Sequence, residues 1–249
     1  MPRAKLERQV LLIDADDTLW ETNLHFERVV SAFCDLVGFL GYANDYVRQQ
    51  VDFAERTNIA RRGYGAGSFL LTLEEVYLKL AGHRAQQAHR QQIRGFRRVL
   101  LEEPLRLFDG VAETLAYLAA RHRLLLFSRG DAGEQSRKVV ASGLAPRFES
   151  WEIVPEKNEA AYRTLVERHG LRPAQVWMVG NSPRFDINPA LAAGLNAVFI
   201  PAVHSWEYEN EEIRPGPPVP TAPSGAEGSG DEGGRLLVLQ RFRDLQEHF

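Results

Sequence analysis

Val10–Trp20, VLLIDADDTLW, changes abruptly from apolar to acidic residues. Its first four residues, Val10–Ile13, form an unbroken apolar run, which is typical of a strand buried on both faces in a parallel sheet. Asp14, Asp16 and Asp17 follow where the strand must end, and open α/β sheets bind ligands at the carboxyl ends of their strands. Neighbouring carboxylates repel one another unless a cation such as Mg²⁺ neutralises them. The alternative interpretation is an acidic turn that caps the next helix.

Length and composition restrict the class of protein. The chain has 249 residues, 44% of them hydrophobic, which is enough for one large domain or two modest ones with proper cores. Its formal net charge of −3 shows no basic excess that would favour nucleic acid or an anionic membrane. The single cysteine, Cys34, fits a reducing cytoplasm. No apolar run is long enough for a signal peptide or a spanning helix, so we expect a cytoplasmic protein.

Helical periodicity dominates the segment after Trp20. Apolar residues recur at spacings of three and four as far as Gly41, and the pattern predicts further helices over 44–61, 73–80 and 86–100. The next strand-like run begins only after residue 120, so an all-helical insert follows the first strand. We therefore expect a core formed by residues 1–19 and 106–249 and a helical insert formed by residues 20–105.

A glycine-rich segment, RRGYGAGSF, covers Arg61–Phe69 inside this insert. One interpretation is a flexible connection between two helices. In the other, the glycines let backbone amides approach an anion, with Arg62 and Tyr64 in contact with a substrate.

Strand and helix patterns alternate from Asp109 onward, which predicts a parallel sheet with helical crossovers. A segment rich in proline and glycine, 215–234, should be a flexible loop without a core of its own. The expected strands are 124–127, 151–154, 176–179, 197–200 and 236–239, and the expected helices are 109–121, 131–143, 158–169, 186–193 and 242–249.

Three later loops each follow an expected strand, so they should share the sheet edge that carries Asp14. Ser128 and Arg129 open the first of these loops, where a hydroxyl and helix-opening amides suit a phosphoryl oxygen. Lys157 lies in the second, where an ammonium group would offset the acid cluster. The third contains Asp186, just ahead of a helix. Taken singly, each loop is also compatible with an ordinary turn, a solvated lysine or a helix cap.

The segments DADDTLW, FSRGD, the isolated Lys157 and GNSPRFDINPA resemble, in this order, the four motifs of haloacid dehalogenase-like phosphatases. The likeness covers essentially residues 10–200, and Arg62–Leu71 is similar to helical cap sequences of the bacterial phosphatase branch. It implies a Rossmann-like, doubly wound α/β core with an inserted all-helical cap. One departure is Asn181, which stands where the fourth motif usually has an acidic residue.

This resemblance also implies residue roles. Asp14 would be the nucleophile and Asp16 the general acid and base, with Lys157 holding the phosphoryl group. Mg²⁺ would be bound by Asp14, the backbone carbonyl of Asp16, Asn181 and Asp186. The activity expected is Mg²⁺-dependent hydrolysis of a small phosphorylated metabolite through an aspartyl-phosphate, by a monomer or a homodimer.

Other functions are compatible with the same motifs. A haloacid dehalogenase shares the nucleophile and fold, although its family pattern lacks the second aspartate. A phosphomutase would transfer the phosphoryl group from Asp14 to a second hydroxyl rather than to water. Asn181 also leaves open a non-catalytic, phosphate-binding member of the family.

Overall fold

The computed structural model describes residues 5–214 and 234–249. The chain divides into two compact units: an α/β unit, formed by the residues up to 21 and from 105 onward, and a helical unit, residues 22–104. The sequence predicts boundaries after residues 19 and 105. Apart from Gly234, the segment expected to be a flexible loop lies outside the described residues. No helix of the described residues combines the length and apolar character needed to cross a membrane.

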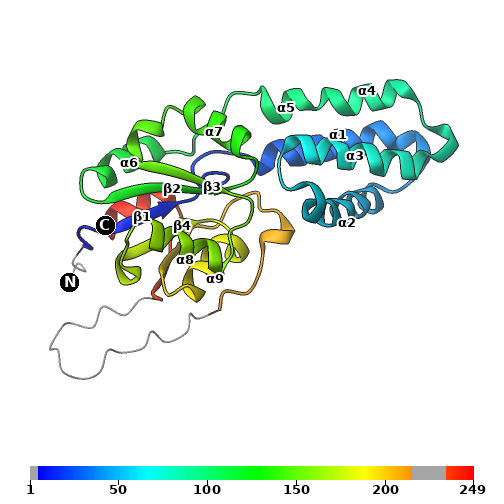
Figure 1. The fold of residues 1–249 in the computed structure, drawn as a ribbon. Coiled ribbons are helices and arrows are strands. Elements are labelled where there is room, and N and C mark those ends of the chain that lie inside the picture. The colour runs from blue at the N-terminus through cyan, green and yellow to red at the C-terminus, as the bar shows by residue number, and fades with distance from the viewer. Residues whose placement is uncertain (1–4, 215–233) are drawn as a thin grey trace. The chain divides into compact units, whose positions relative to one another are not determined.

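The α/β unit is built on a six-stranded parallel sheet, whose strand order is β3-β2-β1-β4-β5-β6. Figure 1 labels the first four strands of the chain, β1 to β4. Strand β1 lies in the middle, where Leu11 pairs with Leu124 of β2 on one side and with Trp177 of β4 on the other. The fold class predicted from the sequence is therefore confirmed. The strands are β1 Val10–Ile13, β2 Arg123–Arg129, β3 Ser150–Val154, β4 Val176–Gly180, β5 Asn196–Phe199 and β6 Leu236–Val238.

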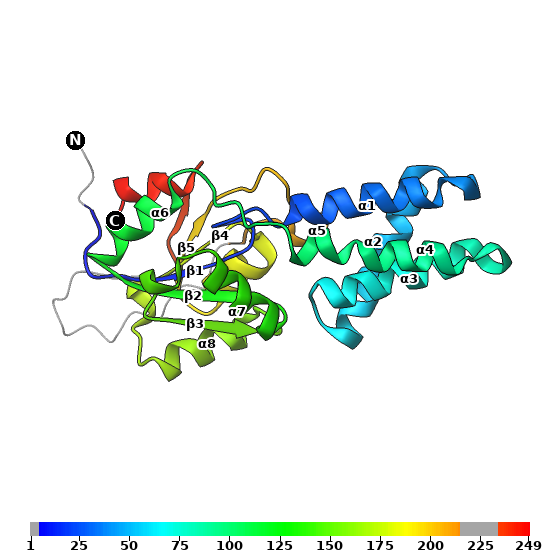
Figure 2. The same ribbon diagram turned by 90° about the horizontal axis from the view of Figure 1, so that it is seen from above.

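Alternate residues of β1 face two different helical layers. Leu11 and Ile13 pack with α6 (Val111–Ala119) and the C-terminal segment, whereas Val10 and Leu12 pack with α8 (Glu159–Arg168) and α9 (Asn188–Ala192). Figure 2 shows α6 and α8 on opposite sides of the sheet. Because both faces are covered, an apolar residue is needed at every position of this strand, and all four are buried.

The helical unit has a core of its own, formed mainly by apolar residues three or four positions apart on successive helices. Its helices are α1 Asn23–Val37, α2 Asn44–Arg62, α3 Ala66–Ala81, α4 Gln87–Gly95 and α5 Arg97–Leu101. The predicted helix over 86–100 is divided at Phe96. Glycine, which ends α4, is among the weakest helix formers.

The glycine-rich segment is more helical than the sequence predicts. Arg61 and Arg62 end α2, and α3 begins at Ala66 rather than at 73, so only Gly63–Gly65 forms the turn. Both Gly63 (φ 73°) and Gly65 (φ 121°) have positive φ, which glycine adopts without steric cost. Burial of the apolar side chain of Phe69 on α3 stabilises the helical conformation of this segment in spite of its glycines.

Two other expected helices also differ in the α/β unit. The helix predicted over 186–193 begins as a π-helical turn, Pro183–Ile187, and continues as α9. The C-terminal helix predicted over 242–249 is a 3₁₀ helix, Phe242–Glu247. The remaining crossover helix, α7, spans Ala132–Ala141, and Asp131 caps it by accepting a hydrogen bond from the backbone N–H of Glu134.

Candidate active site

The carboxyl end of β1 lies between those of β2 and β4. Asp14 continues the ladder with β4, because its backbone N–H donates to the carbonyl oxygen of Val179 at 2.9 Å. Ser128, which is buried, lies near the end of β2, and Asn181 directly follows β4. Sheet topology alone therefore brings residues more than a hundred positions apart to one edge.

Lys157 joins two of the predicted acidic residues. Its Nζ lies 2.5 Å from Oδ1 of Asp14 and 2.7 Å from Oδ1 of Asp186. The side chain of Lys157 is 1% exposed, that of Asp14 10% and that of Asp186 2%. A buried ammonium between two buried carboxylates satisfies charges that would otherwise be costly to remove from water.

The pKa values of this cluster are strongly perturbed. Burial, and then the neighbouring Asp186, raise the pKa of Asp14 to about 7, although Lys157 opposes the shift. Burial alone would lower the pKa of Lys157, but Asp14 and Asp186 raise it above its ordinary value. The raised pKa of Asp14 favours its neutral form, whereas the raised pKa of Lys157 favours its charged form. Above the folded pKa of Asp14 both groups are charged, and the 2.5 Å contact between the ammonium donor and the carboxylate acceptor is then an ion pair.

Thr18 connects the nucleophile candidate to the loop after β4. Its Oγ1 lies 3.1 Å from Oδ2 of Asp14 and 3.1 Å from Oδ1 of Asn181, and its single proton serves one acceptor at a time. The turn that carries Thr18 is closed by Asp17, whose φ of 59° is unusual for a residue other than glycine. Thr18 belongs to the quoted motif, but the sequence assigned it no role at the site.

Asp186 is held close to the backbone of its own loop. Its Oδ2 accepts a hydrogen bond from the N–H of Ser182 at 3.0 Å. A Cβ atom on Gly180 would come within 2.3 Å of the same oxygen, so the carboxylate can occupy this place only because residue 180 is glycine. The π-helical turn carries Asp186 inward, where it contacts Lys157.

Arg129 is engaged by a residue that the sequence did not single out. Its guanidinium group lies 2.8 Å from Oε1 of Glu209 and 3.5 Å from the ring centroid of Phe185. Burial raises the pKa of Glu209, and Arg129 opposes that shift. The predicted contact of Arg129 with a substrate stays a prediction. The amide of Gly130 donates to Val154 in β3, so it belongs to the sheet rather than to a phosphoryl-binding turn.

Asp16 lies on the other side of the acidic turn. Trp20 Nε1, Gln135 Nε2 and Lys138 Nζ all contact its carboxylate, at distances between 2.7 and 3.0 Å. Gln135 and Lys138 come from α7. The sequence did not single out either residue, because at their helical spacing both look like members of an ordinary polar, solvent-exposed helix face.

Arg62 and Tyr64 belong to the helical unit. Arg62 forms a two-pronged ion pair with Glu75, at 2.7 and 3.0 Å. This pair lowers the pKa of Glu75 and ties the end of α2 to α3. The contact with a substrate that the sequence suggests for both residues stays a prediction.

The oxygen atoms at this edge fit a hard divalent cation. Asp14 and Asp186 offer carboxylates, Asn181 an amide oxygen, and Asp16 a backbone carbonyl, all ligand types that Mg²⁺ accepts. Within residues 5–214 and 234–249, no three side chains of His, Cys, Asp or Glu gather in a metal-binding arrangement. A cation at this edge would therefore need Asn181 or backbone oxygen among its ligands. A cation would also offset the repulsion from Asp186 that helps to raise the pKa of Asp14.

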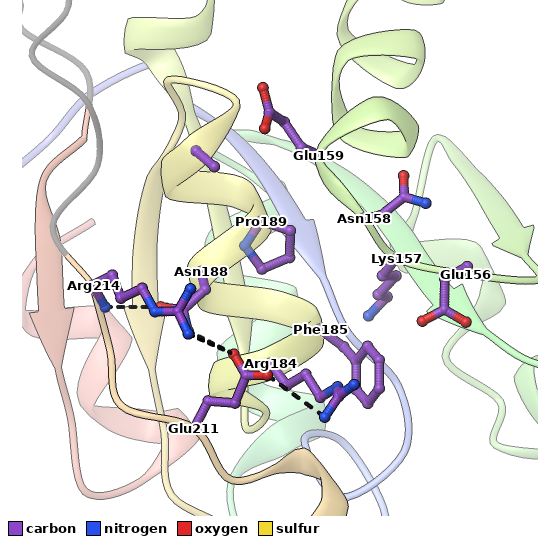
Figure 3. A pocket seen from close by; sticks show the side chains of 11 residues that line it. Glu156, Lys157, Asn158, Glu159, Arg184, Phe185, Asn188, Pro189, Glu211 and Arg214 are labelled. Atoms are coloured by element: carbon purple, nitrogen blue, oxygen red, sulfur yellow. Dashed lines mark hydrogen bonds and ion pairs between the residues drawn. The ribbon is translucent and has the colours of Figure 1, made fainter. Parts of the chain in front are cut away.

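A cavity of about 450 Å³ adjoins the site on the side of α8 and α9. In Figure 3, Glu156–Glu159 line one side, and Arg184, Glu211 and Arg214 line the other. Arg184 lies 3.6 Å from Glu211, and the acidic and basic side chains of the wall are equal in number. This balance does not favour the cavity as a binding site for a free phosphate.

Comparison with known proteins gives a consistent result. A family model described as a haloacid dehalogenase-like hydrolase matches residues 9–194. A haloacid dehalogenase-like family hydrolase from Xanthomonas campestris is similar, with a TM-score of 0.74 and 29% identity over 82% of this chain and 87% of that chain. A search of curated proteins returned no match.

Two further solved structures share the fold at lower identity. YfnB from Bacillus subtilis, solved with bound magnesium, has a TM-score of 0.58 and 20% identity over 78% of this chain and 89% of that chain. L-2-haloacid dehalogenase from Xanthobacter autotrophicus has a TM-score of 0.59 and 15% identity over 96% of each chain. The structures that share this fold therefore include a dehalogenase, and the fold alone does not identify the reaction.

Proposed function

The chain belongs to the haloacid dehalogenase-like hydrolases, and on that premise we propose that it is a Mg²⁺-dependent phosphatase acting on a small phosphomonoester. The observation that carries the proposal is the pair Asp14 and Asp16. The carboxylate of Asp14 contacts the buried ammonium group of Lys157. The carboxylate of Asp16, two residues later, accepts hydrogen bonds from a different set of donors. A phosphatase needs both a nucleophile and a group that protonates the alcohol.

In the first step, an oxygen of Asp14 attacks phosphorus and the bond between phosphorus and the alcohol oxygen breaks. Asp16 gives its proton to that oxygen, so the product leaves as an alcohol. In the second step, water attacks the aspartyl-phosphate and Asp16 takes a proton from the water. Inorganic phosphate leaves, and the carboxylate of Asp14 is restored.

Positive charge is needed because an anionic nucleophile approaches an anionic ester. Lys157 supplies a fixed charge within hydrogen-bonding distance of Asp14, and Ser128, which is buried near the end of β2, would donate to a phosphoryl oxygen. A Mg²⁺ ion held by Asp14, Asp16, Asn181 and Asp186 would add further positive charge at the phosphoryl group. The bound magnesium of YfnB supports this choice of metal.

We also propose the remaining features of the reaction. The substrate is a small phosphorylated metabolite, and the helical unit acts as a cap that selects it, with Arg62 and Tyr64 in contact with it. The net charge of −3 agrees with a protein that uses neither nucleic acid nor membrane as partner. Cys34, the single cysteine, agrees with a cytoplasmic location.

The competing reaction is removal of halide from a haloacid. Halide leaves without a proton, so that reaction does not need Asp16 as a general acid. An assay should therefore compare p-nitrophenyl phosphate, a panel of phosphorylated metabolites and a 2-haloalkanoate, each with Mg²⁺ and with EDTA. The proposal predicts release of inorganic phosphate that EDTA abolishes.

Asp14→Asn should abolish this turnover, whereas Asp35→Asn, at an exposed position of α1, should leave it unchanged. Thermal unfolding should show that both variants are folded. Release of halide without metal, or absence of phosphate release from the whole panel, would refute the proposed function. Phosphate transfer to a second hydroxyl, with no free phosphate, would identify a mutase instead.

A further inference from the structure

Two side chains of one helix, α7, hold the carboxylate of Asp16. Gln135 Nε2 donates to Oδ2 at 2.7 Å, and Lys138 Nζ lies 3.0 Å from both oxygens. The two residues are three positions apart, so they occupy the same face of the helix. Trp20 Nε1 also donates to Oδ1, at 2.7 Å. Donors on both oxygens fix the plane of the carboxylate as well as its position.

The orientation of the Gln135 amide follows from its neighbours. Its nitrogen donates to Asp16 and also to the carbonyl oxygen of Arg129 at 3.1 Å. Both partners are acceptors, so only the NH₂ end can face them. Gly130 permits this approach, because a Cβ at that position would come 3.2 Å from the same nitrogen.

This orientation has a cost. Gln135 is 5% exposed, and its Oε1 has no hydrogen-bond partner among the described residues. A buried acceptor without a partner destabilises the folded state, and such groups call for a functional explanation. An apolar side chain of similar length would avoid this cost. The amide is therefore better explained by what its nitrogen does to Asp16 than by stability.

We propose that Gln135 and Lys138 are positioning residues, which aim the carboxyl group of Asp16 at the leaving-group oxygen. The inference rests on the proposed function, because it assigns Asp16 the transfer of a proton to that oxygen. General acid catalysis contributes about 10²–10⁴-fold, and a misplacement of about 1 Å costs on the order of 10²-fold. Loss of either residue should therefore weaken proton transfer while the nucleophile Asp14 stays in place.

Two phosphate esters distinguish this role from a purely structural one. Glycerol 2-phosphate has an alkoxide leaving group that needs a proton, whereas p-nitrophenolate leaves readily without one. We expect Gln135→Met and Lys138→Met to reduce kcat/KM for glycerol 2-phosphate by at least about 10-fold. For p-nitrophenyl phosphate the loss should stay within about 3-fold, since kcat/KM reports only the steps up to alcohol release.

Three further variants complete the experiment. Asp16→Asn sets the full size of the selective loss. Lys138→Arg keeps a cationic donor and should recover most of the activity toward glycerol 2-phosphate. Arg137→Met removes an exposed cation from the same helix and should leave kcat/KM unchanged for both esters. Thermal unfolding of each variant shows whether α7 is folded.

The outcomes separate the inference from the function on which it rests. No release of phosphate by the wild-type protein with Mg²⁺, from either ester or from any metabolite of the panel, refutes the proposed phosphatase, and the inference with it. Turnover by the wild type, with equal losses on both esters or with none in the two methionine variants, overturns the inference alone. A loss confined to glycerol 2-phosphate, restored by Lys138→Arg, supports it.

Discussion

Replacing Lys157 by methionine should leave two buried carboxylates, Asp14 and Asp186, without the ammonium group between them. Lys157 has a side chain only 1% exposed and contacts both acids within 2.7 Å. Removing one partner of a buried ion pair typically costs about 3–5 kcal/mol. For a chain of this size, that corresponds to a fall in Tm of roughly 6–20 °C.

The loss should depend on pH in a defined direction. The pKa of Asp14 rises from 3.8 to about 7 on folding, so protonating this group stabilises the folded state. That stability is present at acidic pH and is lost as pH rises through the folded pKa. Without Lys157 the pKa of Asp14 should rise further, because a charge that opposes the shift is gone. The variant should therefore be more destabilised at pH 8 than at pH 5.

Tryptophan fluorescence is a suitable measurement in denaturant with EDTA, because all four tryptophans belong to the α/β unit. Arg163→Met is the matched control. It breaks an exposed pair with Glu159, whose side chains are 56% and 50% exposed, and should cost only about 0.3–0.5 kcal/mol. The reasoning is wrong if the Lys157 variant is no less stable than this control at pH 8. A loss of equal size at pH 5 and pH 8 would contradict the role given to Asp14.

Gly180→Ala should destabilise the α/β unit by about 1–3 kcal/mol, because the new Cβ would overlap Oδ2 of Asp186. By contrast, Gly67→Ala in α3 places its Cβ in open space and should stabilise the helical unit by roughly 0.5–1 kcal/mol. Denaturation followed by circular dichroism tests both, and equal effects would contradict the close approach at residue 180. Asn181→Asp adds a carboxylate to the proposed metal ligands, so it should lower the Tm in EDTA and enlarge the rise in Tm caused by Mg²⁺. An unchanged response to Mg²⁺ would exclude residue 181 as a ligand.

Simple physical rules predicted much of the fold and the meeting point of three side chains. The apolar run Val10–Ile13 could satisfy both faces of a sheet only if it lay in the middle, and it does. Asp14, Lys157 and Asp186 each follow a strand, so parallel pairing brought them to one edge. These inferences succeeded because backbone pairing and apolar burial operate along the sequence with a fixed period.

Contacts made by side chains across elements were beyond the same rules. Lys138 reaches Asp16 only because of how α7 packs, and nothing in its helical spacing separates it from a solvated lysine. Glu209 ends a single 3₁₀ turn, Glu207–Glu209, in a stretch whose sequence has no periodicity, yet it pairs with Arg129. The helix predicted from Asp186 begins earlier, as a π-helical turn, because one widened turn lets that carboxylate return to Ser182.

In the sequence, the helical unit comes between β1 and β2, and this order affects how the sheet can assemble during synthesis. Leu11 must find Leu124 and Trp177, so the central strand is made long before either neighbour emerges. The helical unit, by contrast, is one continuous segment whose contacts are all available earlier. Closing so long a loop is slow, and four exposed apolar residues must meanwhile avoid pairing with another chain. Nascent chains interrupted before residue 123 would therefore carry an unprotected strand, and a chaperone that covers short apolar segments would be expected to act in that interval.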